Sequence, residues 1–306
     1  MTNPIAKASR TAIRETLGRI AYEQDQVRLA TTDVGGFDWL VASHRGIYAA
    51  AENGVEPVLH GWFFGLCRHD GHLFVFENCG HRDRESNRGR VVSLAFDGRM
   101  LSAPRIMVRG LHTNCHQIRV IDGLLCVVDT ANQAIRRYTL EGVPVDVRRP
   151  FPIAPPTDRS GAYLHINSIA KVAGRIGLVL HNGAALPEVP SQVAWLDDQW
   201  RINERYTLPG HHCHDILEDE RGRLWHSLSR EGDVMRTDGV RINITSKRMT
   251  RGIALRADTI AVGTSTFGPR HLRGTLNGSV AVLDRNNLMP IHEIEMPAAP
   301  TDIIPL

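Results

Sequence analysis

Apolar residues in this chain fall into short runs that repeat one plan. The clearest copy is Leu111–Thr130, LHTNCHQIRVIDGLLCVVDT, in which two apolar strands flank a tight turn and two histidines stand at the entrance. The last residues, Pro300–Leu306, repeat the first half of this plan. The four further copies are Trp62–Asn78, Leu164–Asn182, His212–Ser229 and Met249–Ser265. Repeats of this size built from short strands are typical of propeller blades.

One aliphatic residue marks the same place in every copy, and these anchors stand 37 to 52 residues apart. In the five complete copies a Gly or Asp follows five or six residues later, and these residues suit the positive φ of a turn between two strands. An outer pair of strands is expected after each inner pair, most clearly at Arg90–Phe96, RVVSLAF. The pattern therefore predicts an all-β fold, a six-bladed propeller of four-stranded blades. The anchors are Leu66, Ile118, Ile169, Ile216, Ile253 and Ile303.

The two ends of the chain are predicted to share one blade. Trp39–Ser43, WLVAS, reads as the second strand of the unit that begins at Pro300–Leu306. An N-terminal strand placed there would close the ring and remove the open sheet edges that invite aggregation. We therefore expect a propeller over residues 37–306 and a helical extension over residues 1–36.

The extension contains one helical pattern. Thr11–Gln24 carries Ile13, Leu17 and Ile20 at helical spacing, with charged residues between them. This spacing predicts an amphipathic helix packed on the outside or at one end of the propeller. Its polar face mixes both signs of charge, which disfavours a membrane-surface role.

Composition narrows the class of protein. The formal net charge of +3 is small for 306 residues, and no long run of Lys or Arg occurs, so nucleic acid is not an expected partner. The five cysteines lack CxxC spacing, which favours a reducing compartment over a disulfide framework. No apolar stretch has the length of a membrane span or a signal-peptide core. We expect a cytoplasmic protein that does not enter membranes, and the pattern leaves its oligomeric state open.

Histidines collect at the entrances of the repeats. Side chains alternate between the two faces of a strand, so residues two, four and six positions before an anchor share one face. Because the first strand of each blade lines the channel of a propeller, we expect these side chains to converge at one mouth. Carboxylates are absent from these positions, and Asp215 falls on the opposite face. The six histidines of this set are His60, His112, His116, His165, His212 and His214.

Imidazoles from separate strands favour a bound transition metal such as Zn, Mn, Fe or Cu. His112 and His116 stand about 13 Å apart on an extended strand, too far to share one ion. His212 and His214 stand about 6.6 Å apart, which is feasible if their side chains lean together. The predicted metal ligands are His116, His165, His212 and His214.

The remaining residues on this face have predicted roles toward a small-molecule substrate. With no carboxylate expected in the channel, His112 or His60 would serve as the general base. Arg251 would stabilise negative charge that develops on an oxygen atom. The predicted substrate-binding residues are Trp62, Phe64, Asn114, Asn167 and Tyr163.

A plainer interpretation stands beside the metal site. A histidine in a strand is more often a hydrogen-bonded core residue than a ligand, and His44 is assigned to the core or the surface. His181 and His226 lie in second strands and are expected to bond the backbone. Cys115 and Cys213 are expected to be small buried residues rather than nucleophiles. On this interpretation the channel mouth is a polar cavity of water and imidazoles.

The HxxxHQI, HxNSI, HCHDI and TRGI entrances, each followed by a turn and an apolar strand, resemble the six-bladed propellers grouped with NHL repeats, SMP-30/gluconolactonases and virginiamycin B lyase. The resemblance implies the fold over about Phe37 to Leu306, and the metal ligands expected of SMP-30 proteins have no matching positions here. It also implies lyase or hydrolase chemistry by analogy. An all-histidine shell would resemble the four-histidine iron of carotenoid cleavage propellers, and hence an oxygenase.

Two alternatives carry no catalysis. One is a propeller that binds a small ligand or a protein partner at the channel mouth. The other is a scaffold whose contacts lie in the Arg-rich loops Cys79–Gly89 and Phe267–Gly278.

Overall fold

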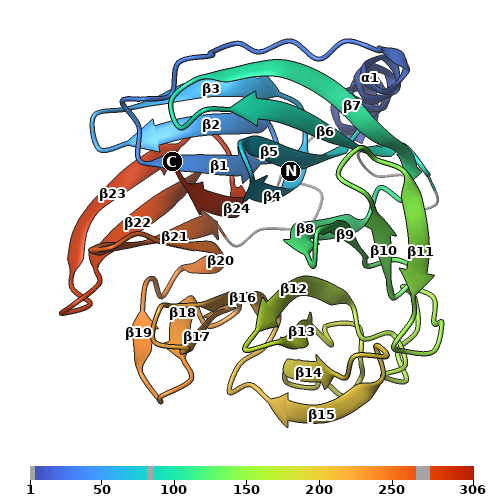
Figure 1. The fold of residues 1–306 in the computed structure, drawn as a ribbon, viewed down its shortest axis with the longest axis vertical. Coiled ribbons are helices and arrows are strands. Elements are labelled where there is room, and N and C mark those ends of the chain that lie inside the picture. The colour runs from blue at the N-terminus through green and yellow to red at the C-terminus, as the bar shows by residue number, and fades with distance from the viewer. Residues whose placement is uncertain (1–3, 81–85, 267–275) are drawn as a thin grey trace.

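Six antiparallel sheets of four strands form a ring in this protein (Figure 1). The computed structural model describes residues 4–80, 86–266 and 276–306, so residues 81–85 and 267–275 of the two Arg-rich loops lie outside the described part. Five blades follow the chain in order, namely β4–β7, β8–β11, β12–β15, β16–β19 and β20–β23. The sixth has the order β24-β1-β2-β3. The predicted all-β, six-bladed architecture is confirmed.

The strands are short, as the apolar runs predict. Their bounds are β1 Trp39–Ser43, β2 Gly46–Ala51, β3 Gly54–His60, β4 Phe63–His69, β5 His72–Asn78, β6 Gly89–Phe96, β7 Leu101–Leu111, β8 Cys115–Ile121, β9 Leu124–Asp129, β10 Ala134–Tyr138, β11 Pro144–Arg148, β12 Ile166–Val172, β13 Arg175–Leu180, β14 Gln192–Leu196, β15 Ile202–Thr207, β16 His214–Glu218, β17 Leu224–Leu228, β18 Asp233–Arg236, β19 Arg241–Asn243, β20 Arg248–Leu255, β21 Thr259–Thr266, β22 Gly278–Asp284, β23 Pro290–Met296 and β24 Pro300–Pro305.

The N-terminal strand closes the ring. Strand β1 pairs antiparallel with β24, placing Val41 opposite Ile303 and Leu40 opposite Ile304. The first and last segments of the chain therefore complete one blade, as predicted. Closure completes the sixth blade, and the ring keeps only the short edges of its separate four-stranded sheets.

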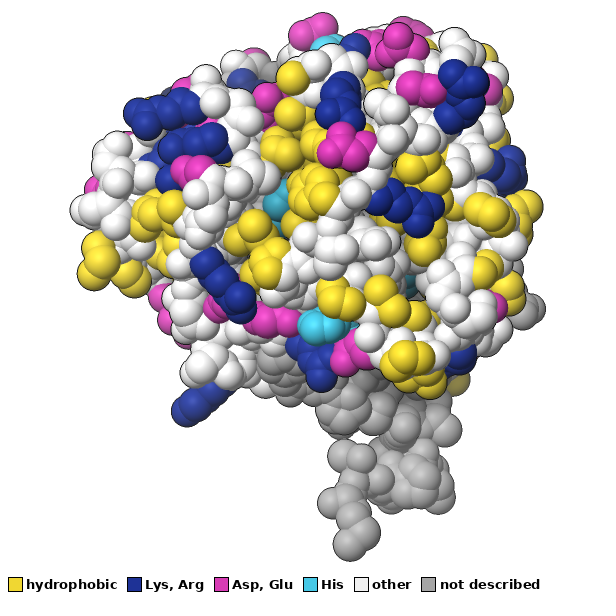
Figure 2. Space-filling view, turned by 90° about the horizontal axis from the view of Figure 1, so that it is seen from below, with side chains coloured by type: hydrophobic (Ala, Val, Ile, Leu, Met, Phe, Trp, Pro, Cys, Tyr) yellow, Lys and Arg dark blue, Asp and Glu magenta, His cyan; other side chains and the backbone are white. Residues whose placement is uncertain are grey.

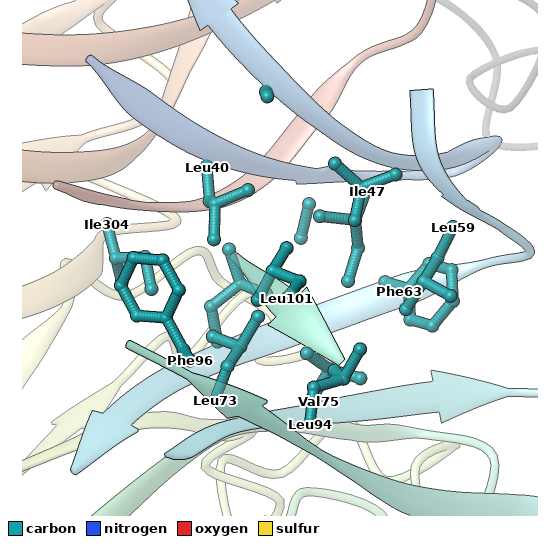
Figure 3. Packing of buried hydrophobic residues seen from close by; sticks show 14 of the residues in the cluster. Leu40, Ile47, Leu59, Phe63, Leu73, Val75, Leu94, Phe96, Leu101 and Ile304 are labelled. Carbon is teal, nitrogen blue, oxygen red and sulfur yellow. The ribbon is translucent and has the colours of Figure 1, made fainter. Parts of the chain in front are cut away.

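The core lies between neighbouring blades. Leu40 and Ile47 of the sixth blade pack with Leu73 and Leu94 of the first in one buried cluster (Figure 3). The six anchor residues are all buried, with exposed fractions of 3% or less. Each anchor fills the space between its own inner strand and an adjacent sheet, so the periodic apolar residues set the spacing of the blades.

Every inner strand has a register shift just before its anchor. In β8 the pairing shifts between Cys115 and Ile118, and in β16 between His214 and Leu217. Equivalent shifts occur in the four other inner strands. A bulge places two residues opposite one and breaks the alternation of faces. Residues one and two positions before an anchor therefore need not point to opposite faces.

The residue directly before an anchor ties one blade to the next. Gln117 accepts a hydrogen bond from the backbone N–H of Ile169 at 2.9 Å. Asp302 accepts one from Leu66 at 2.8 Å, and Asp215 accepts one from Gly252 at 3.0 Å. These bonds join successive inner strands across the channel wall. They give the bulged positions a structural role.

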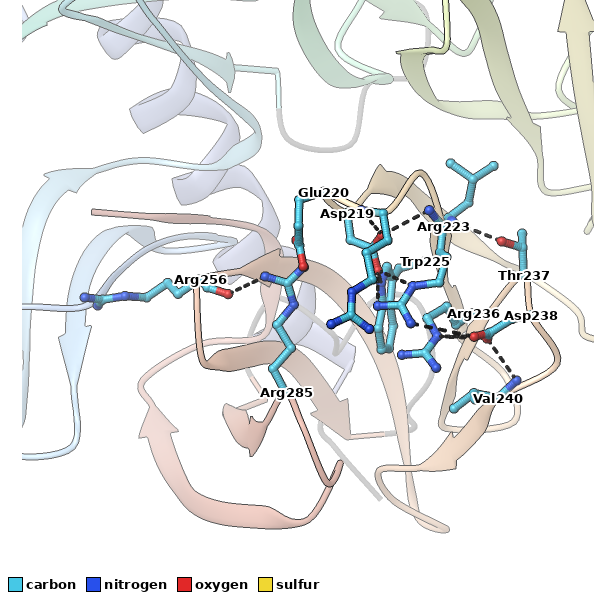
Figure 4. Close-up of polar contacts among 12 residues, drawn as sticks. Asp219, Glu220, Arg223, Trp225, Arg236, Thr237, Asp238, Val240, Arg256 and Arg285 are labelled. Atoms are coloured by element: carbon cyan, nitrogen blue, oxygen red, sulfur yellow. Dashed lines mark hydrogen bonds and ion pairs between the residues drawn. The ribbon is translucent and has the colours of Figure 1, made fainter.

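The blade turns on the other side of the strands are held by aspartates. In the β16–β17 turn, Asp219 accepts bonds from the backbone N–H groups of Arg221 and Arg223 and from the Trp225 indole (Figure 4). The Arg223 guanidinium pairs with the same carboxylate at 2.8 Å. These bonds, opposed by partial burial, lower the pKa of Asp219 to about 2. The carboxylate therefore stays ionised and keeps the turn in place.

The N-terminal helix α1 covers Pro4–Glu23 and lies outside the first blade, near β6 and β7 (Figure 1). Arg90 donates to the carbonyls of Ala21 and Gln24 while its guanidinium pairs with buried Glu77 at 2.7 Å. The arginine thus caps the C-terminus of the helix, where the backbone dipole favours a cation. The apolar residues Ile13, Leu17 and Ile20 are exposed rather than packed. The location agrees with the prediction, and among the helix side chains that the structure describes, the contacts lie at its capped end rather than at these three apolar residues.

The five cysteines are free and buried. Burial raises the pKa of Cys115 well above that of an exposed thiol, and raises the pKa of Cys213 to about 12. Both therefore remain neutral thiols at neutral pH, in agreement with the prediction that they are small buried residues. Among the described residues, no helix combines the length and apolarity needed to cross a bilayer.

Candidate functional site

A cavity of about 280 Å³ opens where the inner strands begin. Among the described residues it is lined from every blade except the first; eight of the 17 lining residues stand two or four positions before an anchor, and two segments of the third blade add to it. The side chains that define its chemistry are His44, Asn114, His116, Arg159, Tyr163, His165, His181, His212, His214, Met249 and Arg251. A pocket of this size suits a small molecule.

Five imidazoles form one connected cluster on the side of blades two, three and four. The rings of His116 and His165 are 5.1 Å apart between centroids, and those of His165 and His181 are 4.4 Å apart. His181 stacks on His212 at 4.5 Å and meets His214 edge-on at 5.4 Å. The structure therefore brings together the four histidines predicted as ligands, and it adds His181 at their centre.

Neighbouring groups set the tautomer of His116. Its Nδ1 lies 2.8 Å from the hydroxyl oxygen of Thr130, and that hydroxyl donates to the carbonyl of Ile166 at 2.7 Å. With its own proton used, the Thr130 oxygen can only accept from the ring. The carbonyl of Asn114, 3.2 Å from Nδ1, is also only an acceptor. Nδ1 therefore carries the proton, and Nε2 carries the lone pair of the neutral ring.

His214 repeats this arrangement two blades away. Its Nδ1 lies 2.9 Å from the hydroxyl of Ser229. The ring also hydrogen-bonds to the backbone of His212, as His116 does to the backbone of Asn114. An imidazole whose Nδ1–H is held by an oxygen acceptor is the usual form of a metal-binding histidine, because the held proton orients the ring.

Two rings of the cluster, those of His181 and His214, are held in the neutral form. Burial lowers the pKa of His181 well below the usual value, and the rings of His165, His212 and His116 lower it further. Burial also lowers the pKa of His214, and the charge of Arg251 adds to the effect. Neutral rings carry lone pairs, so at neutral pH these side chains can bind a metal ion or accept protons.

Two of the clustered histidines have an uncommon backbone conformation. His165 and His212 hold equivalent places in neighbouring blades, and their φ angles are 53° and 54°. Left-handed φ values are unfavourable for residues other than glycine and gather at functional sites. The surrounding fold therefore maintains a costly geometry that directs both rings into the cavity.

The wall opposite the histidines has a different character. Blades five and six contribute the apolar side chains of Met249, Ala299 and Pro300, together with Ser265 and His44. Arg251 stands between the two halves, with its guanidinium 5.4 Å from the centre of the Phe64 ring. Arg159 reaches the cavity from the segment before β12 and donates to the carbonyl of Ala184 at 3.2 Å. The cavity thus has its imidazole cluster on one side and a wall with three apolar side chains on the other.

A smaller chamber lies deeper in the channel. All six residues placed two positions before an anchor line it, which agrees with their predicted common face; they are Phe64, His116, Asn167, His214, Arg251 and Thr301. Buried Asp215 and Asp302 line it too. The expectation that the channel lacks carboxylates is therefore wrong, because the bulges turn the residue before each anchor inward as well. Burial raises the pKa of Asp302 to about 6.

Several predicted site residues lie outside the mouth cavity. His60 is exposed at the end of β3 and His112 is half-buried, and neither lines the cavity. Nδ1 of His112 accepts the backbone N–H of Asn114 at 3.0 Å. Trp62 lies behind His44 and outside the cavity lining, and the centroids of these two rings are 4.9 Å apart. Asn167 lines the deeper chamber, and its amide donates to the carbonyl of Cys213 at 2.9 Å.

Asn114 and Tyr163, by contrast, line the mouth cavity together with the four predicted ligands. The Tyr163 ring lies 5.7 Å from that of His165, edge to face. His226, predicted to bond the backbone, has Nδ1 2.9 Å from the carbonyl of Asp215, as expected.

Three cavity residues escaped sequence reasoning. His181 directly follows the second strand of its blade and bonds the backbone as expected, since its Nδ1 accepts the N–H of Gly183 at 3.1 Å, but its ring also lies among the other imidazoles. His44 follows β1, and Arg159 belongs to a loop. The sequence did contain a signal for His181 and His44. Each directly follows the second strand of its blade, and an antiparallel second strand ends at the channel mouth, where the first strand begins.

The donor set suits a transition metal, but the rings are not arranged as a finished site. In the described part of the chain, no group of three or more His, Cys, Asp or Glu side chains has the geometry to hold a metal ion. Rings that share a tetrahedral ion at metal–nitrogen distances of about 2.0–2.1 Å have centroids roughly 5 Å apart. The His116–His165 and His181–His214 pairs have about this spacing. The stacked His181 and His212 rings, at an interplanar angle of 12°, do not converge.

Comparison with known proteins identifies only the fold. No protein-family model matches the chain, and no curated protein matches it. A protein of unknown function from Bacteroides caccae matches with a TM-score of 0.59 and 12% identity, over 88% of this chain and 98% of the other. A chain of a nidogen/laminin complex matches with a TM-score of 0.61 and 10% identity, over 87% and 97%.

A virginiamycin B lyase from Staphylococcus aureus also matches, with a TM-score of 0.44 and 14% identity, over 76% of this chain and 83% of the other. Identities this low describe architecture and leave chemistry open. The chain is a six-bladed β-propeller by its own sheet topology, and the comparisons show a likeness of fold alone.

Proposed function

We propose that the channel mouth is the site of a metal-dependent enzyme acting on a small molecule. The observation that carries the proposal is the repeated anchoring of His116 and His214, whose Nδ1 atoms lie within hydrogen-bond distance of hydroxyl groups; in His116 this leaves the lone pair on Nε2. Cores seldom bring five imidazoles together, because each buried ring loses solvation. A bound divalent transition metal would offset that cost.

The ligands would be His116, His165 and His214, with one of His181 and His212. Only one of the stacked pair would join, because parallel rings cannot both direct a nitrogen at the same ion. Entry of the ion would require this pair to separate by rotation of a side chain. Zn, Mn, Fe and Cu all accept imidazole ligands. When bound, such a metal would supply Lewis-acid activation.

The remaining imidazole of the pair would move the proton. Both rings line the cavity, and burial holds His181 neutral. Because Nδ1 of His181 accepts from Gly183, its proton lies on Nε2, from which it can be donated to a bound molecule. This assignment replaces His60 and His112, which lie outside the cavity. Arg251 would hold an oxygen that gains negative charge during the reaction. Lyase, hydrolase or oxygenase chemistry remains a proposal by analogy with the resembling propellers.

Alanine variants of His116 and His214 test this proposal. Both are expected to lose metal binding and activity together, measured by competition with a chromophoric chelator. His69→Ala is the matched control, because His69 pairs with Asp70 at the far end of β4. Retention of full metal affinity by both site variants would contradict the assignment.

A second candidate is a non-catalytic pocket that binds a small ligand between the imidazole and apolar walls. The stacking of His181 on His212 favours it, since parallel rings pack against each other without an ion between them. On this account the wild-type protein binds no metal, and the His116 and His214 variants still fold.

A further inference from the structure

The side chains that line the mouth cavity carry an unbalanced charge. Two arginines, Arg159 and Arg251, line it, and no Asp or Glu is among its lining residues in the described part of the chain. The imidazoles add no compensating negative charge, whatever their protonation. A ligand that enters this cavity therefore meets a positive potential.

The carboxylate nearest to Arg251 in the deeper chamber is already engaged. Asp215 accepts bonds from the hydroxyl of Ser227 at 2.8 Å and from the N–H of Gly252 at 3.0 Å, both through Oδ2. These bonds hold adjacent blades together, and they direct the carboxylate toward the channel wall. Arg251 lines both chambers, so its charge acts on the mouth as well.

Near the rim, another carboxylate is engaged by its neighbours and does not line the cavity. Glu188 pairs with Arg230, and its Oε1 lies 3.6 Å from Nε2 of His212. Glu188 is not among the lining residues. The carboxylates that flank the mouth are thus bonded to neighbouring residues of the channel wall, whereas the two arginines line the cavity.

The opposite half of the cavity adds a second requirement. Met249, Ala299 and Pro300 contribute apolar side chains there. Aromatic rings lie behind Arg251, since Phe64 lies under its guanidinium and Trp62 stacks on Phe64 at 5.8 Å. A guanidinium braced against a ring keeps its N–H groups in a fixed fork, the geometry that recognises a carboxylate.

We infer that the mouth cavity recognises a small amphipathic organic anion, a carboxylate on an apolar or aromatic body. The carboxylate lies at Arg251 and Arg159, and the body lies against Met249, Ala299 and Pro300. The inference names a substrate class for the site of the proposed function, but it depends on the arginines and the apolar wall and not on a metal.

The test uses the full chain, stripped of metal with a chelator, and a panel of probes measured by calorimetry. The panel holds benzoate, phenylacetate and hexanoate, each with its uncharged amide. At least one carboxylate is expected to bind at least about ten-fold more tightly than its amide. Arg251→Gln and Arg159→Gln are expected to remove that preference. Arg221→Gln, an exposed arginine in the β16–β17 turn, is the control for loss of one charge and is expected to bind like the wild type.

Three results would overturn the inference. They are equal binding of every carboxylate and its amide, unchanged preference in both site variants, and a preference that appears only after metal is restored. The last result would support the proposed metal site while removing the role of the arginines. Carboxylate binding by a protein that takes up no metal would have the opposite meaning, since the inference would stand and the metal proposal would fail.

Discussion

The Nδ1 of His116 lies 2.8 Å from the hydroxyl of Thr130, and that hydroxyl donates to the carbonyl of Ile166. Thr130 is fully buried and belongs to the second blade, whereas Ile166 begins the third. The same side chain therefore links two blades and fixes the proton on a histidine of the cavity. Fold and site are joined at this residue.

Thr130→Val is expected to weaken metal binding about 10- to 100-fold, the usual effect of removing a partner that orients a ligating histidine. Valine keeps the shape but cannot accept the Nδ1 proton. Competition titration with a chelator measures the effect. Thr130→Ser, which keeps the hydroxyl, is the control and should bind nearly as tightly as wild type. Equal affinity for the Val and Ser variants would show that this tautomer does not matter.

His181→Asn is expected to reduce metal affinity or ligand binding by at least about ten-fold, because it removes the ring that contacts three other imidazoles. His60→Ala should have no effect, since His60 is exposed outside the cavity. Both variants can be compared in one titration series. The account would be contradicted by the reverse order, with His60 essential and His181 silent.

Buried His226 predicts a pH effect on stability. Burial lowers its pKa to about 4, although its bond to the Asp215 carbonyl raises the pKa. A folded-state pKa below the unfolded value gives stability that is complete above about pH 6.5 and is lost as the pH falls toward 4. The contribution is about 3 kcal/mol over this window.

His226→Asn, which can still donate to that carbonyl, isolates this contribution. The free energy of unfolding of the wild type should fall by about 3 kcal/mol more than that of the variant between pH 6.5 and pH 4. Comparing the two proteins cancels the contributions of other titrating groups to the pH dependence of stability. One such group is Asp302, whose raised pKa changes the stability in the opposite direction. Urea denaturation at several pH values measures the difference. Parallel pH profiles for the two proteins would be inconsistent with a neutral, buried His226.

Asp302 is expected to stabilise the closed ring, because it bonds the sixth blade to the first. Its two carboxylate oxygens accept the N–H groups of Leu66 and Ile303 at 2.8 and 3.0 Å. Asp302→Ala leaves both buried donors without that partner and should lower the free energy of unfolding by about 2–4 kcal/mol. Asp302→Asn keeps one acceptor oxygen and should lose less. Thermal and urea denaturation of the two variants give the comparison, and an Ala variant as stable as wild type would rule out this role.

The periodic residues allowed the fold to be predicted almost completely. Anchors such as Ile118 and Ile303 are buried between blades, and burial of an aliphatic residue is the strongest signal in a sequence. The pairing of Trp39–Ser43 with the C-terminal strand followed from counting half-units at the two ends. These features depend on the spacing of hydrophobic residues, which can be read directly from the sequence.

The site could be predicted only in part, because it depends on small departures from the regular alternation of the strands. Alternation placed His116 and His214 in the channel but placed Asp215 outside, and the bulge before each anchor overturned the second result. Spacing carries no sign of such a bulge. His181 and Arg159 enter from the end of a second strand and from a loop, where no period places them. The surface seen in Figure 2 mixes basic, acidic and apolar side chains, so it gives no competing indication of a functional face.

Elemental analysis of the purified protein, expressed without a histidine tag, tests the central claim most directly. The account predicts close to one equivalent of Zn, Mn, Fe or Cu per chain, and its loss in the His116→Ala and His214→Ala variants. A wild-type protein that contains none of these metals, and takes up none when they are added, would contradict the metal-dependent site and leave the histidine cluster as a ligand-binding wall.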